Sequence, residues 1–506
     1  MERGATVQAN RWSKAASAWP GYANTGAAAG RGAPIDRSFP VKRILSALLL
    51  AGAPLYAATP ATTAAVSAAS ATQEQTLGNG MKVIVREDHR APVVVTQVWY
   101  KVGSSYEPGG LTGASHVLEH MMFKGTARLK PNEFSRIIAD NGGEENAFTG
   151  SDYTAYFQTL AADRLEVSLR LEADRMRNLR LDAGEFAKEI EVVKEERRLR
   201  TDDQPQALLY EQFNATAFLA HPYRNPVIGW EDDLATLTVA DLKDWYRRWY
   251  QPSNATLVVV GDVEPARVFS LARRYFGGLP GGTVTPPKRQ LEPLQRGERR
   301  LELKAPAEVP YIIMGYHAPA ATADAADWEP YALEVLAGVL DGGESARLAS
   351  QVRRGQEIAA SAGAGYRSFQ RAPGLFLLEG TPAQGRSVEE LEQALRAQIR
   401  TLTQQPVSAD ELERVKAQVV AAEVYQRDSV FYQAMRIGLL ETIGLGWRVG
   451  EDYAARIRAV TPEQVQQVAL RYLGEDKLTV GVLRPQPGAL PKRTNKVPGG
   501  RHDIGG

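Results

Sequence analysis

The order of predicted strands and helices repeats once along this chain of 506 residues, and the repeat constrains the fold more than any other feature. Two Val-rich strands followed by a helix are predicted within residues 81–124. A segment rich in Gly, Pro and basic residues lies at 277–296, as expected of a linker. The same succession of two strands and a helix is then predicted within residues 300–340. A pattern that starts over after a linker indicates two homologous domains.

The domain boundaries follow from this repeat. A chain of this length is too long for one ordinary hydrophobic core, which agrees with two or more domains. The expected segments are an upstream extension with a signal peptide (1–57), a flexible lead-in (58–73), a first domain (74–280), a linker (281–297), a second domain (298–485) and a disordered tail (486–506).

Composition excludes several classes of function. The chain has 60 Lys and Arg against 59 Asp and Glu, a formal net charge of +1. We therefore expect no nucleic-acid binding, because domains that bind nucleic acid are usually strongly basic. The chain has no cysteine, which excludes thiol catalysis, disulfides and cysteine-bound zinc. His, Asp and Glu remain as the strong metal ligands.

The N-terminal region has the pattern of an export signal. Two basic residues precede an apolar run at 44–53, and small residues follow, with cleavage expected near Ala57. The run is too short to span a bilayer well, so we expect a signal peptide that starts near Val41 and directs the protein to the periplasm. Residues 1–40 would then come from an upstream start site. The alternative is an uncleaved segment that anchors the protein in the membrane.

The strongest chemical signal is the segment 116–120, with the sequence His-Val-Leu-Glu-His. Residues four apart lie on one face of a helix, so His116 and His120 can bind one ion. Glu119 lies beside them and can accept a proton without being a ligand. The pattern H-x-x-E-H is a signature of zinc peptidases, and a chance match is rare in a chain with six histidines. The alternative is two histidines on a polar helix face.

A catalytic zinc site needs a third protein ligand, and the residues alone leave its identity open. His221 and His317 are candidates by residue type. A later charged helix offers carboxylates, and Glu189 and Glu196 share one of its faces because they are seven residues apart, close to two turns. Spacing hardly separates Glu196 from Glu195. Charged runs on long helices also usually face solvent.

Residues 113–126, which include the H-x-x-E-H segment, resemble the zinc-site segment of the pitrilysin/insulinase family. Within that family the similarity is to the branch of mitochondrial processing peptidase and its bacterial relatives, and it extends over about residues 74–485. The resemblance implies an α+β fold of two homologous domains, each a mainly antiparallel sheet packed with helices, which form a clam-shell. It also implies a zinc-dependent endopeptidase that hydrolyses extended peptides or unfolded protein segments.

The resemblance assigns roles in the metal site. It implies one Zn²⁺ per chain, held by His116, His120 and Glu196. Glu119 would be the catalytic base, and Glu189 would support the ligands from the surrounding shell.

The resemblance also implies contacts with a peptide substrate. Residues 142–149 resemble the family's substrate-binding edge strand, and residues 340–348 resemble its glycine-rich segment. The residues expected to bind substrate are Asn146, Ala147, Thr149, Tyr366 and Arg367. Arg371 is an alternative to the last pair.

The family resemblance leaves the assembly and two rival functions open. We expect a homodimer, or a heterodimer with a paralogous subunit. A non-catalytic subunit or scaffold of a peptidase-like complex is one alternative, although such members typically lose the ligand set. An unrelated metal-dependent hydrolase of small molecules is the other, and the duplicated halves speak against it.

Overall fold

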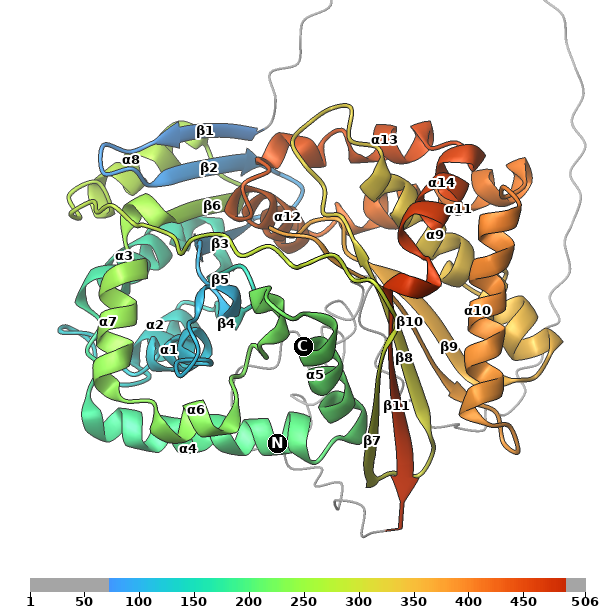
Figure 1. The fold of residues 1–506 in the computed structure, drawn as a ribbon. Coiled ribbons are helices and arrows are strands. Elements are labelled where there is room, and N and C mark those ends of the chain that lie inside the picture. Colours follow the sequence, from blue (N-terminus) through green and yellow to red (C-terminus); the bar gives the residue numbers. More distant parts are fainter. Residues whose placement is uncertain (1–71, 488–506) are drawn as a thin grey trace, which may run out of the picture. The chain divides into compact units, whose positions relative to one another are not determined.

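Two β-sheets organise residues 72–487, the part of the chain that the computed structural model describes (Figure 1). The predicted signal peptide, most of the predicted lead-in and nearly all of the predicted tail lie outside the described residues and stay predictions. The lead-in was expected to end at residue 73, but the first strand begins at Thr72. That strand is mostly exposed and has no apolar alternation, so the sequence pattern did not indicate it.

The first sheet has six strands in the order β1-β2-β6-β3-β5-β4. The strands are β1 (Thr72–Thr76), β2 (Lys82–Glu87), β3 (Val93–Tyr100), β4 (Glu144–Thr149), β5 (Thr154–Ala161) and β6 (Ala255–Gly261). β2 and β6 are parallel, and the other neighbours are antiparallel. β6 is an apolar run with every residue buried, as expected of a strand with a neighbour on each side. β4 forms one edge of the sheet.

The second sheet repeats the topology of the first. Its order is β7-β11-β8-β10-β9, with β7 parallel to β11 and the other neighbours antiparallel. The strands are β7 (Arg299–Pro306), β8 (Tyr311–Ala318), β9 (Ala359–Tyr366), β10 (Gly374–Pro382) and β11 (Leu478–Gln486). Counted along the chain from β2 and from β7, both sheets run first, fifth, second, fourth, third. In each sheet the first and fifth strands form the parallel pair.

Helices occupy corresponding places in the two halves. The first half has α1 (Ala114–Met121), α2 (Glu133–Asp140), α3 (Leu165–Asn178), α4 (Ala183–Arg197), α5 (Pro205–Ala217), α6 (Glu231–Thr236), α7 (Val239–Trp249) and α8 (Pro265–Tyr275). The second half has α9 (Glu329–Asp341), α10 (Val388–Gln404), α11 (Ala409–Gln426), α12 (Val430–Thr442), α13 (Tyr453–Ala459) and α14 (Pro462–Tyr472). α7 and α14 even begin with equivalent capping boxes, at Thr238 and Thr461. The predicted α+β fold of two homologous halves with mainly antiparallel sheets is confirmed.

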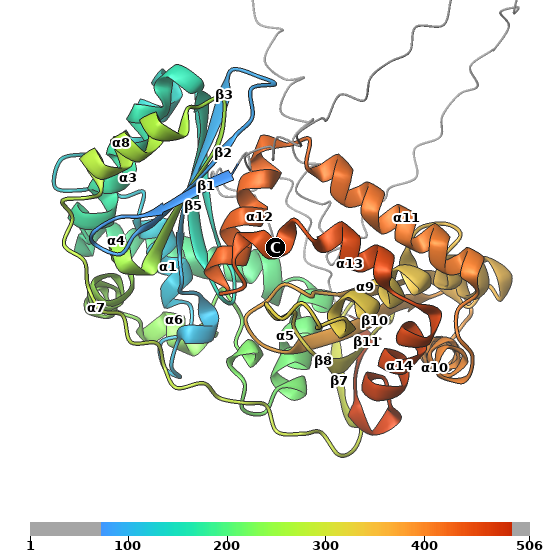
Figure 2. The same ribbon diagram turned by 90° about the horizontal axis from the view of Figure 1, so that it is seen from above.

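One helix of each half packs against the sheet of the other half. α5 lies against β11 and β7, where its Leu209 and Phe213 join Leu483 in a small apolar core (Figure 1). α12 lies against β3 and β6 (Figure 2), and the Trp99 indole occupies the space that a Cβ on Gly438 would need. Both halves belong to one compact unit. Each sheet is therefore covered partly by helices of its own half and partly by a helix of the other half. No helix within residues 72–487 is long and apolar enough to cross a membrane.

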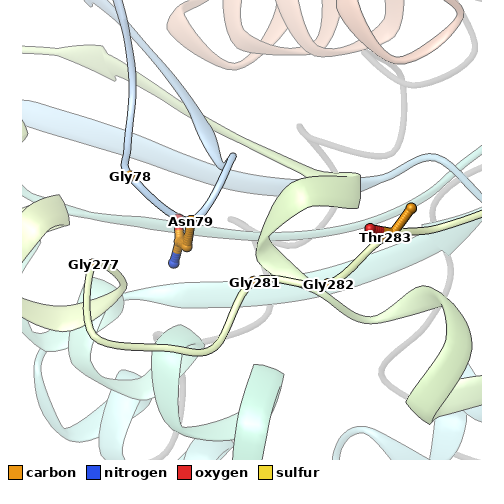
Figure 3. A pocket seen from close by; sticks show the side chains of 6 residues that line it. All are labelled: Gly78, Asn79, Gly277, Gly281, Gly282 and Thr283. Atoms are coloured by element: carbon orange, nitrogen blue, oxygen red, sulfur yellow. The ribbon is translucent and has the colours of Figure 1, made fainter.

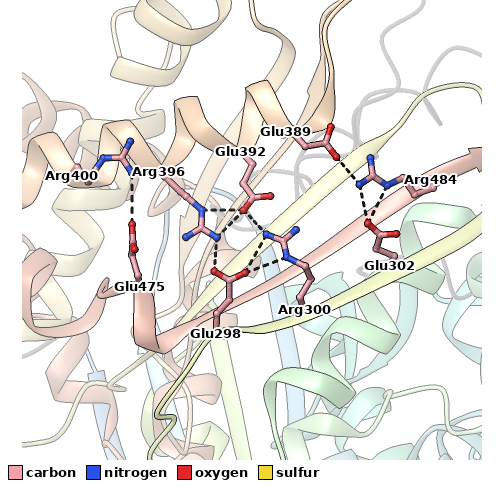
Figure 4. Close-up of polar contacts among 9 residues, drawn as sticks. All are labelled: Glu298, Arg300, Glu302, Glu389, Glu392, Arg396, Arg400, Glu475 and Arg484. Atoms are coloured by element: carbon pink, nitrogen blue, oxygen red, sulfur yellow. Dashed lines mark hydrogen bonds and ion pairs between the residues drawn. The ribbon is translucent and has the colours of Figure 1, made fainter.

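An ion-pair network fastens α10 to the β7–β11 edge of the second sheet (Figure 4). Arg484 on β11 binds Glu302 on β7 at 2.9 Å and Glu389 on α10 at 2.6 Å. Arg300 on β7 binds Glu392 on α10 at 2.6 Å. The arginines are partly exposed, so each pair alone contributes little to stability.

Candidate metal centre

Helix α1 carries the H-x-x-E-H segment, and a buried carboxylate holds its N-terminus. The N-cap is Gly113, with φ of 87°, a left-handed conformation that favours glycine. Glu107 accepts hydrogen bonds from the backbone N–H of Gly113 at 2.8 Å and of Ser115 at 2.6 Å. Burial raises the pKa of Glu107 to about 7, although these bonds oppose the shift. The bonds satisfy N–H groups that have no partner within the helix and so fix where α1 begins.

Two histidines of α1 and a glutamate of α4 converge on one point. The Nε2 atoms of His120 and His116 lie 3.4 Å and 3.9 Å from the same oxygen, Oε2 of Glu196. One donor atom from each of the three residues lies within 4.8 Å of the other two. Among residues 72–487 no other group of three or more His, Asp or Glu side chains comes together in this way. Two imidazoles and a carboxylate are a donor set that suits zinc, so the residues fit the metal that the motif implies.

Neighbouring charged groups orient two of these donors. Glu189 lies 3.0 Å from Nδ1 of His120, and Lys124 lies 2.6 Å from the other oxygen of Glu189. A carboxylate on Nδ1 leaves Nε2 of the ring for a metal. Arg200 lies 2.6 Å from Oε1 of Glu196, so that Oε2 faces the histidines. Burial lowers the pKa of His120, but the hydrogen bonds with Glu189 and Glu196 outweigh it and raise that pKa to about 9.

Glu119 lies on the same helix but faces the edge strand β4. Its carboxylate oxygen Oε2 accepts a hydrogen bond of 2.5 Å from the Thr149 hydroxyl. The side chain is buried, and burial raises its pKa to about 7. Thr149 was expected to bind substrate, and in the structure its hydroxyl binds Glu119. Nothing in the sequence pattern indicated this contact, because the two residues come from different elements.

Strand β4 lies at the edge of the first sheet, as the family resemblance implied. It pairs with β5 on one side, and no other strand of residues 72–487 lies on its second side. Asn146 and Ala147 are buried in the middle of the strand. The open backbone edge therefore runs past Asn146 and Ala147 to Thr149, next to Glu119.

The geometry separates the third-ligand candidates that spacing left open. His221 and His317 both contact backbone atoms elsewhere and are not part of the cluster. Glu195 is 44% exposed and binds Arg198 at 2.5 Å, whereas Glu196 is 15% exposed and faces the histidines. The packing of α4 against α1 makes this choice, and a single helix cannot show it.

Comparison with known proteins agrees with the sequence resemblance. The family model described as Insulinase (Peptidase family M16) matches residues 82–231, and the model described as Peptidase M16 inactive domain matches residues 236–419. The zinc protease PqqE of Helicobacter pylori is 35% identical over 346 residues, which cover 67% of this chain and 77% of that protein. The chain belongs to peptidase family M16, the insulinase family.

Solved structures share the M16 architecture of this chain. A protease from Helicobacter pylori matches with a TM-score of 0.77 and 31% identity, over 82% of this chain and 99% of that one. The periplasmic protease PqqL from Escherichia coli matches with a TM-score of 0.70 and 19% identity, over 83% of this chain and 48% of that one. At that identity PqqL shows the fold alone.

The second half of this M16 chain lacks the ligand set. Counted from the N-caps of α1 and α9, Tyr331 and Val335 stand where the first half has its two histidines. Counted from the N-caps of α4 and α11, Ala422 stands in place of Glu196. Only the glutamate of H-x-x-E-H has a counterpart, Glu334. The candidate metal donors therefore belong to one half of the repeat.

The substrate contacts predicted for the second half lie around the end of β9. Tyr366 is buried and donates its hydroxyl to the backbone oxygen of Pro319, while Arg367 is exposed. The alternative, Arg371, forms an ion pair of 3.1 Å with Asp152 of the first half. Substrate binding by Tyr366 and Arg367 stays a prediction.

A surface pocket of about 470 Å³ lies away from these residues (Figure 3). Its lining is Gly78, Asn79, Gly277, Gly281, Gly282 and Thr283. The Asn79 amide donates to the backbone oxygens of Phe276 and Leu279. None of the lining residues is ionisable, so the pocket offers no imidazole or carboxylate for zinc and no acid or base.

Gly229→Ala is expected to destabilise the protein by about 1–3 kcal/mol. Gly229 has φ of 93°, and a Cβ there would lie 2.7 Å from the Cα of Gly113 and 2.6 Å from the oxygen of Thr112. The added methyl would push on the N-terminus of α1. Denaturant unfolding measures the change. Gly278→Ala is the control, because its Cβ would meet nothing within 4 Å. Equal stabilities of the two variants would show that the close packing at Gly113 does not matter.

Proposed function

We propose that this chain is a zinc-dependent endopeptidase that cleaves extended peptides or unfolded protein segments. The observation that carries the proposal is the convergence of His116, His120 and Glu196 within 4.8 Å, beside a buried Glu119 on the same helix. Membership of a peptidase family supports it, as does the name zinc protease borne by the relative PqqE. A non-catalytic subunit is the less favoured function, because the first half holds a complete donor set.

Each residue of the centre has a role in peptide hydrolysis. Held by His116, His120 and Glu196, zinc would supply a Lewis acid for the scissile carbonyl and lower the pKa of the attacking water. Glu119 takes a proton from that water and passes it to the nitrogen of the leaving amine. The Thr149 hydroxyl donates to Oε2 of Glu119, and the proposed proton acceptor is Oε1, the oxygen without that bond.

The open edge of β4 supports an extended peptide as the substrate. A peptide that pairs with this edge adds one strand to the first sheet, the binding mode known as β-augmentation. It would run along Asn146 and Ala147 and bring its backbone to Thr149 and Glu119. A folded protein cannot offer such a segment without unfolding locally. Extended and unfolded chains are therefore the proposed substrates.

We further propose that the protein acts in the periplasm, as one of two M16 subunits. The basic, apolar and small residues near the N-terminus support export. A homodimer or a heterodimer with a paralogous subunit is the proposed assembly. Copurification from a periplasmic extract at native expression level would identify the partner.

Removal of metal is expected to stop cleavage of an unfolded reporter protein, and stoichiometric zinc is expected to restore it. The reason is that water and Glu119 alone lack the charge that stabilises the transition state. The measurement is cleavage of the reporter, with metal content determined before and after chelation. The same reporter in its folded form is the control and is expected to resist. Full activity of a protein shown to hold no metal would contradict the proposal.

A further inference from the structure

Arg197 is buried at the end of α4, directly after Glu196. Its side chain is 6% exposed and binds both oxygens of Glu211 on α5, at 2.7 Å and 2.9 Å. The same guanidinium donates to the backbone oxygen of Gly229 at 2.8 Å. One side chain therefore joins the last turn of α4 to α5 and to the loop before α6.

The loop contact leads to the helix that carries the histidines. Gly229 packs so closely on Gly113, the N-cap of α1, that neither position has room for a Cβ. Arg197 thus connects the end of α4, with Glu196, to the start of α1, with His116 and His120. The connection consists of one hydrogen bond and one close backbone contact.

The backbone after Glu196 gives a reason for such an anchor. α4 passes into a π-helical turn, Arg198–Asp202, before α5 begins. A π-helical turn breaks the regular hydrogen-bond pattern of an α-helix and shifts its register. The last turn of α4 is thus not extended by a regular helix. α5, in contrast, is fixed by its packing on the second sheet.

The second half contains the same cross-helix ion pair with the charges reversed. Glu423 stands fifteen residues after the N-cap of α11, as Arg197 does after the N-cap of α4. Arg436 stands seven residues after the N-cap of α12, as Glu211 does after the N-cap of α5. Arg436 and Glu423 lie 3.3 Å apart, and Glu423 is buried. One pair therefore adjoins the candidate ligands, and its counterpart does not.

We propose that Arg197 is a positioning residue that sets the distance between Glu196 and the two histidines. The assignment rests on the metal site of the proposed function and adds a residue to it that touches none of the ligand atoms. If Arg197 had only a general structural role, loss of either ion pair would lower the stability of the protein and neither loss would change zinc affinity. A positioning role predicts that metal binding depends on Arg197 and not on Arg436.

The test compares Arg197→Lys with Arg436→Lys. Lysine keeps the charge, but its single ammonium cannot bind Glu211 with two parallel bonds and reach Gly229 as well. Zinc affinity is measured by competition with a chelating dye, and stability by thermal unfolding of the metal-free protein. Arg197→Lys is expected to lower zinc affinity about tenfold or more, as removal of groups around metal ligands does. Arg436→Lys is expected to keep it within about twofold, while both variants lose stability.

A further variant separates the ion pair from the contact with Gly229. Arg197→Glu combined with Glu211→Arg reverses the pair, an arrangement that the second half already uses. It is expected to regain only part of the stability, because Asp202, 3.4 Å from Arg197, would then face a carboxylate. It is expected not to regain zinc affinity, because a carboxylate cannot donate to the Gly229 oxygen. Regained zinc affinity would overturn the role of the Gly229 contact.

Two other outcomes would overturn the assignment. They are unchanged zinc affinity in Arg197→Lys, and an equal loss of affinity in Arg436→Lys. A wild-type protein without zinc affinity would overturn the metal site itself, which distinguishes a failure of the proposed function from a failure of this inference alone.

Discussion

Glu119→Gln is expected to lower kcat for peptide cleavage about 10²–10⁴-fold while the protein keeps its zinc. Glutamine has the shape of glutamate, and its amide oxygen can still accept the hydrogen bond from the Thr149 hydroxyl. Helix α1 and its histidines should therefore stay in place. An amide cannot take a proton from water at neutral pH, so the general-base contribution is lost. Cleavage kinetics and metal content, measured on the same preparation, test both halves of this expectation.

The second half of the chain offers a matched control for that variant. Glu334 stands at the position of Glu119 in the repeat and accepts hydrogen bonds from the hydroxyls of Ser368 and Tyr453. Glu334→Gln makes the same substitution on the equivalent helix, α9, which has no candidate metal ligands beside Glu334. Its kcat is expected to equal that of the wild type. Unchanged cleavage in Glu119→Gln would refute the base assignment, and loss of zinc from it would make Glu119 a ligand instead.

The local part of the site was predictable because helix periodicity is a local property. A spacing of four residues brings His116 and His120 to one face of α1, and the structure has their Nε2 atoms next to the same carboxylate oxygen. The repeat of strands and helices also predicted two homologous halves, and apart from β1 both sheets have the same strand order. Spacing alone could not choose between Glu195 and Glu196, because the choice depends on which face of α4 packs against α1.

The remaining features depend on contacts between distant parts of the chain. The sequence pattern does not tell which sheet α5 and α12 pack against. α5, from the first half, packs on the second sheet, and α12, from the second half, packs on the first sheet. No local pattern distinguishes this from packing within each half. The bond of Thr149 to Glu119 and that of Arg197 to Gly229 join elements whose approach is set by the whole fold. Such contacts can be identified only in the three-dimensional structure.

Glu196→Gln is expected to lower zinc affinity more than about 100-fold, beyond the range typical of groups that only surround the ligands. Burial raises the pKa of Glu196, but the hydrogen bond with His120 and the nearby positive charges outweigh it and lower that pKa to about 2. The residue is therefore an anion that faces the histidines. A neutral amide offers a weaker ligand and leaves Arg200 without its counter-charge. Equilibrium competition with a chelator measures the affinity.

Glu195→Gln is the control, since it alters a neighbouring carboxylate that is bound to Arg198 at the surface. Its zinc affinity is expected to match the wild type, and a loss there with none in Glu196→Gln would reverse the ligand assignment. The effect of excess zinc distinguishes Glu196→Gln from Glu119→Gln. It should restore part of the cleavage in Glu196→Gln, because mass action refills a weakened site. It should restore none in Glu119→Gln, because that variant holds its metal and lacks only the group that moves the proton.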